Sequence, residues 1–254
     1  NGYGTFTEII KTALGHTSNF SMGCDLADIN NDGCLDLFVA DMLPEDNYRQ
    51  KILQGPTRYD MYQLAVDLGY GHQVMQNTLQ INNGNNTFSE IANYAGVAAT
   101  DWSWAPLFSD FDNDGYQDLF VTNGFRRDFT DMDFTKYTFA EEEKKAFAEG
   151  KKVNTLNLVE KMPSVKIPNY IFKGNESLQF ENKTLEWGFN TPSFSNGAAY
   201  GDLDQDGDID IVVNNINNEA FIYRNDINKT LDNHYLQVEI KGIGNNSNAI
   251  GTRV

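Results

Sequence analysis

Short apolar runs recur at three places along the chain, and each run directly follows a polar, aspartate-rich stretch. The runs are Leu37–Ala40, Leu119–Thr122 and Ile211–Asn214. They contain many of the β-branched and aromatic residues that are enriched in strands. The pattern therefore predicts three equivalent strands, with a polar turn at the start of each.

The polar stretches in front of these strands resemble one another. DINNDGCLDLFV begins at Asp28, DFDNDGYQDLFV at Asp110 and DLDQDGDIDIVV at Asp202. A phenylalanine lies 22 residues before the start of every copy, and these residues are Phe6, Phe88 and Phe180. A chance acidic cluster would not keep this spacing three times. The chain therefore contains an internal repeat whose length differences lie elsewhere.

Further strands complete the repeated unit. The segments NTLQI from Asn77, NYIFK from Asn169 and EAFIYRN from Glu219 are similar to one another. Asn-Gly pairs at 1–2 and 83–84 are strong signals of a hairpin turn. A full unit is then a short strand, a Gly/Asn turn, a strand that ends at the phenylalanine, a loop, a strand, the acidic turn and a last strand. About four short strands per unit are typical of a propeller blade, so we expect an all-β fold.

Two long insertions interrupt the repeats, over residues about 41–76 and about 125–168. YDMYQLAVDLG in the first has apolar residues at helical spacing and a glycine stop, and FTKYTFAEEEKKAFAEG in the second carries charge on one face. We expect both insertions to be partly helical. Insertions on one rim of a repeat scaffold often build a binding face, and the alternative is that they only cap blade edges.

Aromatic and basic residues in and near the insertions allow two interpretations. Four tyrosines of the first insertion could stack on sugar rings or pack in a core; they are Tyr48, Tyr59, Tyr62 and Tyr70. Trp102 and Trp104 in DWSW alternate, so they should lie on one face, in a core between blades. Arg126 and Arg127 are expected to balance nearby acids.

The overall composition narrows the class of protein. Hydrophobic residues make up 40% and aromatic residues 13% of the 254 residues, which is typical of a globular chain. The net charge of −17 repels nucleic acids and anionic membranes, and it suits cations. No stretch approaches the roughly 20 apolar residues of a membrane span. A disulfide between the two cysteines, Cys24 and Cys34, stays an open alternative.

The acidic copies place oxygen-bearing side chains at positions one, three, five and nine, counted from the first aspartate. Position six is Gly33, Gly115 or Gly207, where the chain turns sharply and a Cβ atom would obstruct it. Position seven would donate its backbone carbonyl to a metal. Calcium takes six to eight oxygen ligands in a flexible shell. The predicted ligands are Asp28, Asn30, Asp32, Cys34, Asp36, Asp110, Asp112, Asp114, Tyr116, Asp118, Asp202, Asp204, Asp206, Asp208 and Asp210.

The loops resemble the first half of an EF-hand loop but differ from it at position twelve. An EF-hand has a bidentate glutamate there, and this chain has Val39, Val121 and Val213. We therefore predict calcium-binding β-hairpin loops, with about one Ca²⁺ in each of the three, and magnesium suits such a protein cage less well. The alternative is a set of Asx-rich turns without metal. Because Asn30 replaces an aspartate, the first loop should be the weakest site.

The three DxDxDGxxD-type loops and the NGxGTF-like turns resemble FG-GAP/VCBS repeats, the calcium-bearing blades of integrin-α-like β-propellers. The resemblance covers about residues 1–226. It implies a β-propeller of four-stranded blades with calcium-binding hairpin loops and partly helical insertions. Because a closed ring typically has four to eight blades, three blades imply a fragment of a larger propeller.

A second resemblance lies at residues 233–254. Their sequence, NHYLQVEIKGIGNNSNAIGTRV, is similar to the start of an ASPIC/UnbV domain, which commonly follows such repeats in secreted bacterial proteins. The period-two pattern of YLQVEI also predicts a strand by itself. We therefore expect a β domain to begin after the repeats.

These resemblances imply a protein of the extracellular space or cell surface, including the outer membrane of a Gram-negative bacterium. Its expected role is recognition, adhesion or assembly, with a protein or polysaccharide ligand on the insertion-bearing face. An alternative is a structural subunit of a surface complex. The competing class is a calcium-dependent carbohydrate-active enzyme similar to polysaccharide lyases. Catalysis finds little support, because His16, His72 and His234 are scattered and suggest no triad or zinc site.

Overall fold

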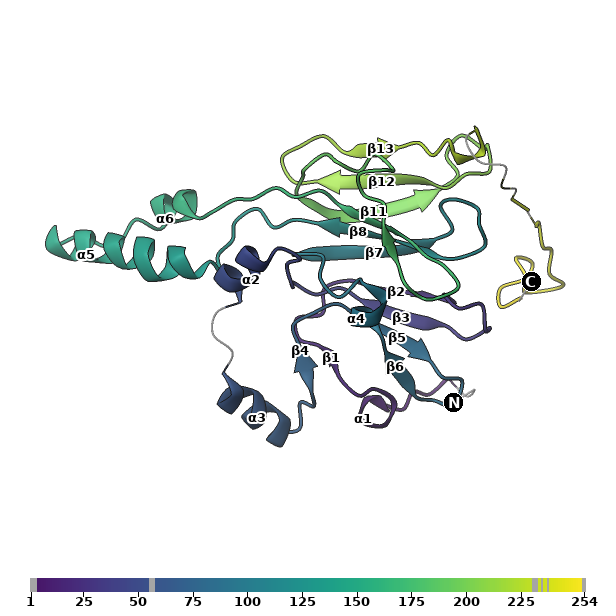
Figure 1. Cartoon of the computed structure of the whole chain (residues 1–254), viewed down its shortest axis with the longest axis horizontal. Coiled ribbons are helices and arrows are strands. Elements are labelled where there is room, and N and C mark those ends of the chain that lie inside the picture. Colours follow the sequence, from purple (N-terminus) through teal and green to yellow (C-terminus); the bar gives the residue numbers. More distant parts are fainter. Residues whose placement is uncertain (1–3, 55–57, 230–232, 234, 237, 253–254) are drawn as a thin grey trace.

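Three antiparallel sheets lie side by side in the computed structural model (Figure 1). Each sheet contains the two strands that flank one acidic loop, followed by strands from the start of the next repeat of the sequence. The structure describes residues 4–54, 58–229, 233, 235–236 and 238–252. Sheet 1 has the strand order β2–β3–β5–β6 and sheet 2 the order β10–β9–β8–β7. Sheet 3 has the order β11–β12–β13 within the described part of the chain. Four strands per sheet are thus confirmed for sheets 1 and 2, but the expectation that one repeated unit forms one sheet is wrong, because each unit is divided between two neighbouring sheets.

The strands follow one another along the chain, so each sheet is a meander. Sheet 1 consists of β2 (Cys24–Ala27), β3 (Asp36–Val39), β5 (Thr78–Asn82) and β6 (Phe88–Glu90). Sheet 2 consists of β7 (Ser103–Ser109), β8 (Asp118–Asn123), β9 (Tyr170–Lys173) and β10 (Glu181–Asn182). Sheet 3 consists of β11 (Ser195–Gly201), β12 (Asp210–Asn215) and β13 (Phe221–Tyr223).

The three strands predicted from the apolar runs are present as β3, β8 and β12. Each begins one residue earlier than predicted, at the aspartate of position nine. These aspartates are Asp36, Asp118 and Asp210. The strands start early because backbone N–H groups hold the aspartate side chain in place, as described below for the acidic loops.

The prediction that a strand ends at the repeated phenylalanine is wrong. β6 begins at Phe88, β10 begins directly after Phe180, and Phe6 lies outside the strands. The turn before β6 is longer than the Asn-Gly pair, because Asn83 donates its backbone N–H to the carbonyl of Thr87 at 3.0 Å. Strand pairing therefore starts only after this turn has closed.

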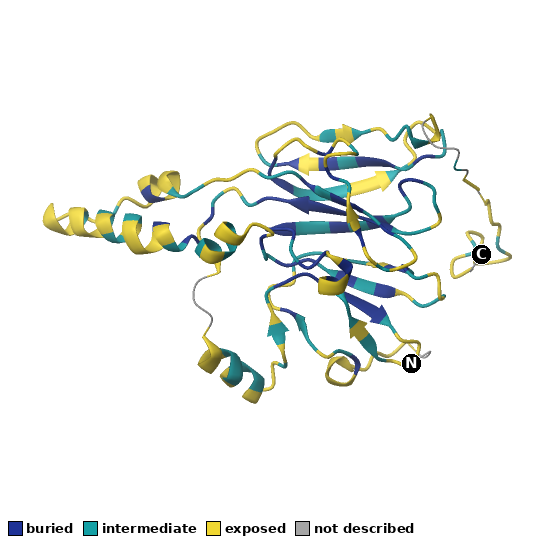
Figure 2. Cartoon of the chain, viewed as in Figure 1, coloured by how far each residue is buried: buried dark blue, intermediate teal, exposed yellow. Residues whose placement is uncertain are grey.

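Buried residues are concentrated in the strands of the sheets (Figure 2). Between sheets 1 and 2, Phe38 and Phe108 pack edge to face with ring centroids 6.1 Å apart. Between sheets 2 and 3, Phe120, Ile171 and Val213 belong to a second buried cluster. The first strands of the sheets are neighbours, since β7 contacts both β2 and β11. This packing brings the three acidic loops to one end of the molecule.

The two insertions are partly helical, as predicted. The first contains α2 (Asn47–Leu53), α3 (Tyr59–Asp67) and β4 (Gln73–Val74), which pairs in parallel with β1 (Thr17–Ser18). The second contains a π-helical segment (Phe134–Phe139), α5 (Ala140–Ala148) and α6 (Thr155–Lys161). The remaining helical turns are α1 (Ile10–Ala13), α4 (Ala92–Ala95) and the 3-10 turn Ile227–Lys229. Figure 1 shows α5 and α6 as an arm that projects away from the sheets.

The aromatic residues before the second loop lie elsewhere than predicted. Trp102 and Trp104 do share a face, but they pack on the second insertion and not in a core between repeats. Both rings stack on Phe125, with centroids 4.2 Å and 6.1 Å away, and Phe129 lies 5.4 Å from Trp102. The chain leaves sheet 2 at this point, so its first aromatic residues cover the tryptophans.

The tyrosines of the first insertion do not pack in a core. Tyr48, Tyr59 and Tyr70 are exposed to 66%, 71% and 69%. Tyr62 is partly covered and its hydroxyl forms a hydrogen bond with Nδ1 of His72 at 2.7 Å. The rings therefore lie on the outer surface of the insertion.

A partly buried arginine joins the two insertions. Nε of Arg49 in α2 donates to Asp101 at 2.6 Å, and Nη1 donates to Asp128 at 3.2 Å. The sequence predicts that Arg126 and Arg127 balance nearby acids. Arg127 instead donates to the backbone carbonyl of Met162 at 3.1 Å, at the end of α6. Asp101 and Asp128 thus pair with an arginine of the first insertion.

The predicted strand YLQVEI is wrong for its described residues, 235–236 and 238–240. A strand needs a hydrogen-bonding neighbour, and within the described part of the chain no strand pairs with this segment. The Asn-Gly pair at 1–2 and His234 lie outside the described residues. No disulfide joins Cys24 to Cys34. Among the described helices, none has the length and apolar character that a membrane span requires.

Candidate metal centre

The aspartate at position one folds each acidic loop around its own carboxylate. In the second loop, Asp110 accepts the backbone N–H of Asp114 at 3.0 Å and that of Gly115 at 2.8 Å. Asp28 in the first loop and Asp202 in the third accept the same two hydrogen bonds, from the backbone N–H groups of positions five and six. Three separate sequences therefore adopt one loop geometry.

Two residues of every loop have left-handed backbone conformations. Position six is glycine in each, with φ of +84°, +91° and +94°, as the sequence predicted. Position four has φ of +58°, +55° and +63°, at Asn31, Asn113 and Gln205. Left-handed φ is uncommon outside glycine, and asparagine tolerates it best. The pair of left-handed residues lets the chain close into a tight loop around the carboxylate of position one.

The aspartate at position nine is a buried clamp. Asp118 accepts the backbone N–H of Phe111 with one oxygen and that of Gly174 with the other, both at 2.9 Å. Asp36 and Asp210 make the equivalent pair of bonds in their loops. All three are at least 98% buried. Position nine therefore ties the start of the loop to the third strand of its sheet, whether or not it also binds a metal.

Carboxylates converge in the second and third loops. The groups with ligand atoms within 4.8 Å of one another, among the described residues, are Asp110, Asp112 and Asp114, and Asp202, Asp204 and Asp210. Asp112 is 2% exposed, and its Oδ1 atom is buried without a hydrogen-bond partner. A buried carboxylate oxygen without a partner is costly. This donor set, all oxygen and largely anionic, fits a hard cation such as calcium.

Burial and crowding shift the acidity of these carboxylates. Burial raises the pKa of Asp118 to about 8, against the opposing hydrogen bond from Gly174, and the carboxylate of Asp112 raises it further. Burial likewise raises the pKa of Asp110 and of Asp36. Without a cation, the charged form of these carboxylates is therefore unfavourable in the folded chain. A bound cation would stabilise the charged form.

The first loop differs in one contact. The side-chain amide of Asn30 donates to Oδ2 of Asp32 at 3.0 Å, so a donor occupies a place where the other loops have a carboxylate. The three aspartates of this loop do not form a close cluster like those of the other two loops, in the part of the chain that the structure describes. That the first loop is the weakest site stays a prediction.

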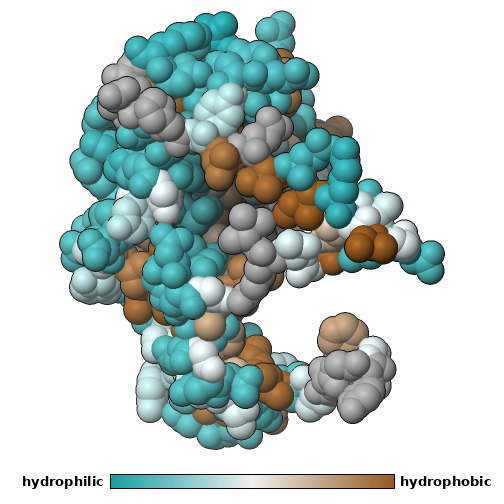
Figure 3. Space-filling model, turned by 90° about the vertical axis from the view of Figure 1, so that its right-hand side faces the viewer, coloured by the Kyte–Doolittle hydropathy of each residue, from teal (hydrophilic) through white to brown (hydrophobic). Residues whose placement is uncertain are grey.

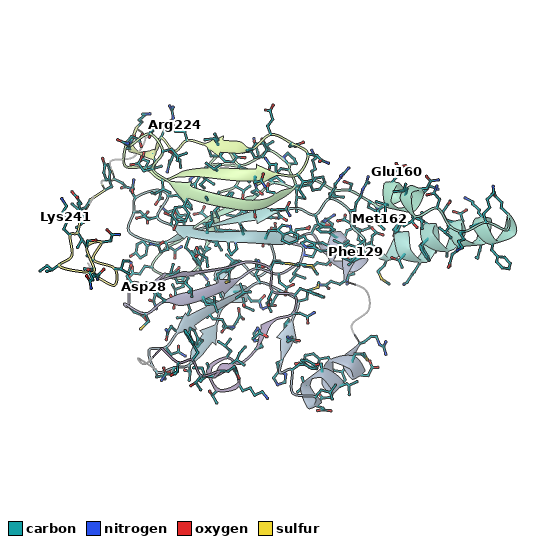
Figure 4. The ribbon with its side chains drawn as sticks, turned by 180° about the vertical axis from the view of Figure 1, so that it is seen from behind. Asp28, Phe129, Glu160, Met162, Arg224 and Lys241 are labelled. Carbon is teal, nitrogen blue, oxygen red and sulfur yellow. The ribbon has the colours of Figure 1, made fainter. Side chains whose placement is uncertain are left out.

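Neighbouring loops are joined by the side chain of position four. Asn31 donates to the carbonyl of Gly115 at 3.1 Å, and Asn113 donates to Asp208 at 2.9 Å. The three loops thus form a continuous row along one end of the sheets. Figure 4 shows Asp28 and Arg224 at this end, and Phe129, Glu160 and Met162 at the other. Figure 3 looks onto the loop end, where hydrophilic residues cover much of the upper part.

Replacing Gly115 by alanine tests the geometry of the loop. A Cβ atom there would meet nothing within 4 Å, so the cost comes from φ alone. We expect a loss of about 1–2 kcal/mol in the free energy of unfolding, or roughly 2–8 °C in melting temperature. Gly15→Ala is the control, because Gly15 has open space and no left-handed φ. Equal melting temperatures for the two variants would contradict the assigned conformation.

Two features of the centre were missed from the sequence. Asparagine or glutamine at position four of every loop was a visible signal for a second left-handed residue. The second is Lys173, the last residue of β9, whose ammonium contacts Asp112 and lies 2.7 Å from Asp114. The segment NYIFK was recognised as a strand, but its charged end was not connected with the loop.

Comparisons with known proteins agree with the repeat. Residues 65–121 match the family model of an FG-GAP-like repeat. The match spans β5, β6, β7 and the second acidic loop, and it ends within β8. A search of curated proteins found no match. The chain therefore contains an FG-GAP-like repeat, located over residues 65–121.

Proposed function

We propose that this chain is a calcium-binding segment of a β-propeller in an extracellular or cell-surface protein, which serves recognition, adhesion or assembly. The observation that carries the proposal is the threefold recurrence of one loop, with the same backbone bonds to positions one and nine. FG-GAP-like repeats are typical of extracellular adhesion-type proteins, which supports the location. The predicted ligands are those of the three loops, with about one Ca²⁺ in each.

The arrangement of the sheets supports the propeller. The first strands β2, β7 and β11 are successive neighbours, as expected for strands that line the axis of a propeller. The three sheets also carry equivalent acidic loops, with the same backbone bonds to the aspartates of positions one and nine. The likeness of residues 233–254 to the start of an ASPIC/UnbV domain is also part of the proposal.

Isothermal titration of the chelator-treated protein with CaCl₂ tests the calcium proposal. We expect binding at up to three sites, because each loop offers oxygen-bearing side chains at positions one, three, five and nine. The matched variants are Asp204→Asn in the third loop and Asp133→Asn in the second insertion, where Asp133 is exposed and makes no cap bond. Only Asp204→Asn should weaken or remove one site. A titration that shows neither a heat signal nor saturable binding would contradict the calcium proposal.

The projecting arm of α5 and α6 supports a partner on the insertion face. Phe147, Leu156 and Tyr137 on this arm are exposed to 88%, 75% and 70%. Exposed apolar residues of this kind favour a protein ligand over a purely polar one. Phe147→Ser with Leu156→Ser should abolish capture of a partner from native surface extract, whereas Lys144→Ser should not. Capture that survives the double variant would contradict the assignment of this arm.

A further inference from the structure

One cation already lies at the second acidic loop, and it belongs to the chain itself. The ammonium of Lys173 contacts the carboxylate of Asp112 and lies 2.7 Å from Oδ2 of Asp114. Asp112 is almost fully buried, whereas the side chain of Lys173 is 29% exposed. The lysine therefore reaches the loop from the solvent side, between positions three and five.

Among the described residues, no lysine or arginine contacts the carboxylates of positions three and five in the other two loops. The strand register sets Phe172 opposite Leu119, and the residue after it is Lys173. The equivalent residue in sheet 1 is Ile81, which is buried and apolar. In sheet 3 it is Arg224, whose guanidinium bonds to Asp226 at 2.9 Å. The charge of Arg224 also acts on Asp204 and Asp206 of the third loop, but no ion pair forms with either. Only the second of the three described loops thus has an ammonium in contact with its inner carboxylates.

The lysine does not satisfy the loop completely. It contacts one oxygen of Asp112, and the other oxygen remains buried without a partner. One positive charge faces the carboxylates of positions one, three and five, so a net negative charge remains. The loop therefore still favours a divalent ion, whose oxygen shell would use the atoms that the lysine now contacts.

We propose that Lys173 is a built-in counter-ion of the second loop, which calcium must displace into solvent in order to bind there. This inference rests on the proposed calcium binding. It predicts that the second and third loops differ in calcium affinity and in what stabilises them without metal. The third loop binds calcium more tightly than the second, and the second loop is held together in the absence of metal by the chain's own ammonium.

Substitution of Lys173 by methionine tests the role of the lysine in the metal-free protein and in the calcium-bound protein separately. In EDTA, Lys173→Met should melt several degrees below the wild type, because the carboxylates of the loop lose their counter-ion. With calcium, the second loop of Lys173→Met should bind about tenfold more tightly than that of the wild type, because nothing has to be displaced. Lys173→Arg keeps the charge and should stay close to the wild type in both measurements. Lys183→Met is the control, since Lys183 pairs with Glu181 and Glu186 outside the loops.

Terbium luminescence reports on the second loop. Tyr116 lies at position seven of this loop and can sensitise a bound Tb³⁺, whereas position seven is Cys34 in the first loop and Asp208 in the third. Tyr235 lies beside Gly207 of the third loop, so the measurement uses a Tyr235→Leu background. Calcium is then titrated to displace Tb³⁺, and its affinity is compared among the variants.

The outcomes distinguish the inference from the proposed function. Tighter calcium binding together with a lower melting temperature in EDTA supports both. Equal calcium affinity in Lys173→Met and wild type overturns the displacement by calcium and leaves the calcium proposal standing. Absence of Tb³⁺ and calcium binding overturns both. An unchanged melting temperature in EDTA overturns the counter-ion role, whatever the loop binds.

Discussion

Removal of calcium with EDTA is expected to lower the melting temperature of the protein by roughly 10 °C or more. Carboxylates in the second and third loops lie within 4.8 Å of one another, and without a cation their charges repel. A ligand at 100 times its Kd stabilises the folded state by about 2.7 kcal/mol per site. Two such sites give about 5 kcal/mol, which corresponds to roughly 10–20 °C for a chain of this size.

Differential scanning calorimetry in EDTA, and after addition of equal excesses of CaCl₂ or MgCl₂, measures this effect. Calcium should restore the transition. Magnesium should restore only a small part of it, because it demands octahedral geometry and retains its waters. An unchanged melting temperature in EDTA would contradict the calcium proposal and favour metal-free Asx-rich turns.

The loops could be predicted from the sequence because their geometry is local. Alternating oxygen-bearing residues followed by glycine at position six set the turn within a few residues, and three phased copies removed the ambiguity of a single one. The strands after the loops and the helices of the insertions follow from apolar patterns in the same way. Each of these elements depends on residues that are close together in the chain.

Contacts between distant segments could not be predicted in this way. Lys173 lies 61 positions from Asp112, and only the pairing of β9 with β8 brings it to the loop. Arg49 reaches Asp128 across 79 positions, between insertions whose lengths follow no repeat. The tail segment YLQVEI shows the opposite error, because a period-two pattern is compatible with a strand but does not supply the neighbour to which a strand must bond.

The substitution Asp118→Ala is expected to destabilise the protein by about 4 kcal/mol, or roughly 8–16 °C. The side chain is fully buried and accepts two backbone N–H groups, from Phe111 and Gly174. Its loss leaves both donors buried without an acceptor, at about 1–3 kcal/mol each. It also detaches the second loop from β9. Thermal unfolding in EDTA measures this part alone, independently of any metal.

Asp133→Ala is the matched control for this substitution. Asp133 is exposed in the second insertion and makes no cap bond, so its removal should change the melting temperature by less than about 2 °C. Asp36→Ala should behave like Asp118→Ala, because Asp36 makes the equivalent pair of bonds to Ile29 and Asn82. A loss for Asp118→Ala no larger than that of the control would contradict the clamp.

The pH dependence of the metal-free protein tests the same carboxylate in another way. Burial raises the pKa of Asp118 from 3.8 to about 8, against the hydrogen bond from Gly174 and with a further increase from Asp112. Between these pH values the folded chain retains a proton that the unfolded chain has lost. The free energy of unfolding should therefore fall as the pH rises from about 4 to about 8.

Asp118→Ala lacks the titrating group, so its stability in EDTA should fall less over this pH range. Calcium favours the charged carboxylates of the loop, so saturating calcium should reduce the slope in the wild type as well. Unfolding by urea at pH 5, 6, 7 and 8, with EDTA and with CaCl₂, measures both slopes. An equal slope for the wild type and Asp118→Ala in EDTA would mean that the proton is held elsewhere, and the buried clamp would then be charged even without metal.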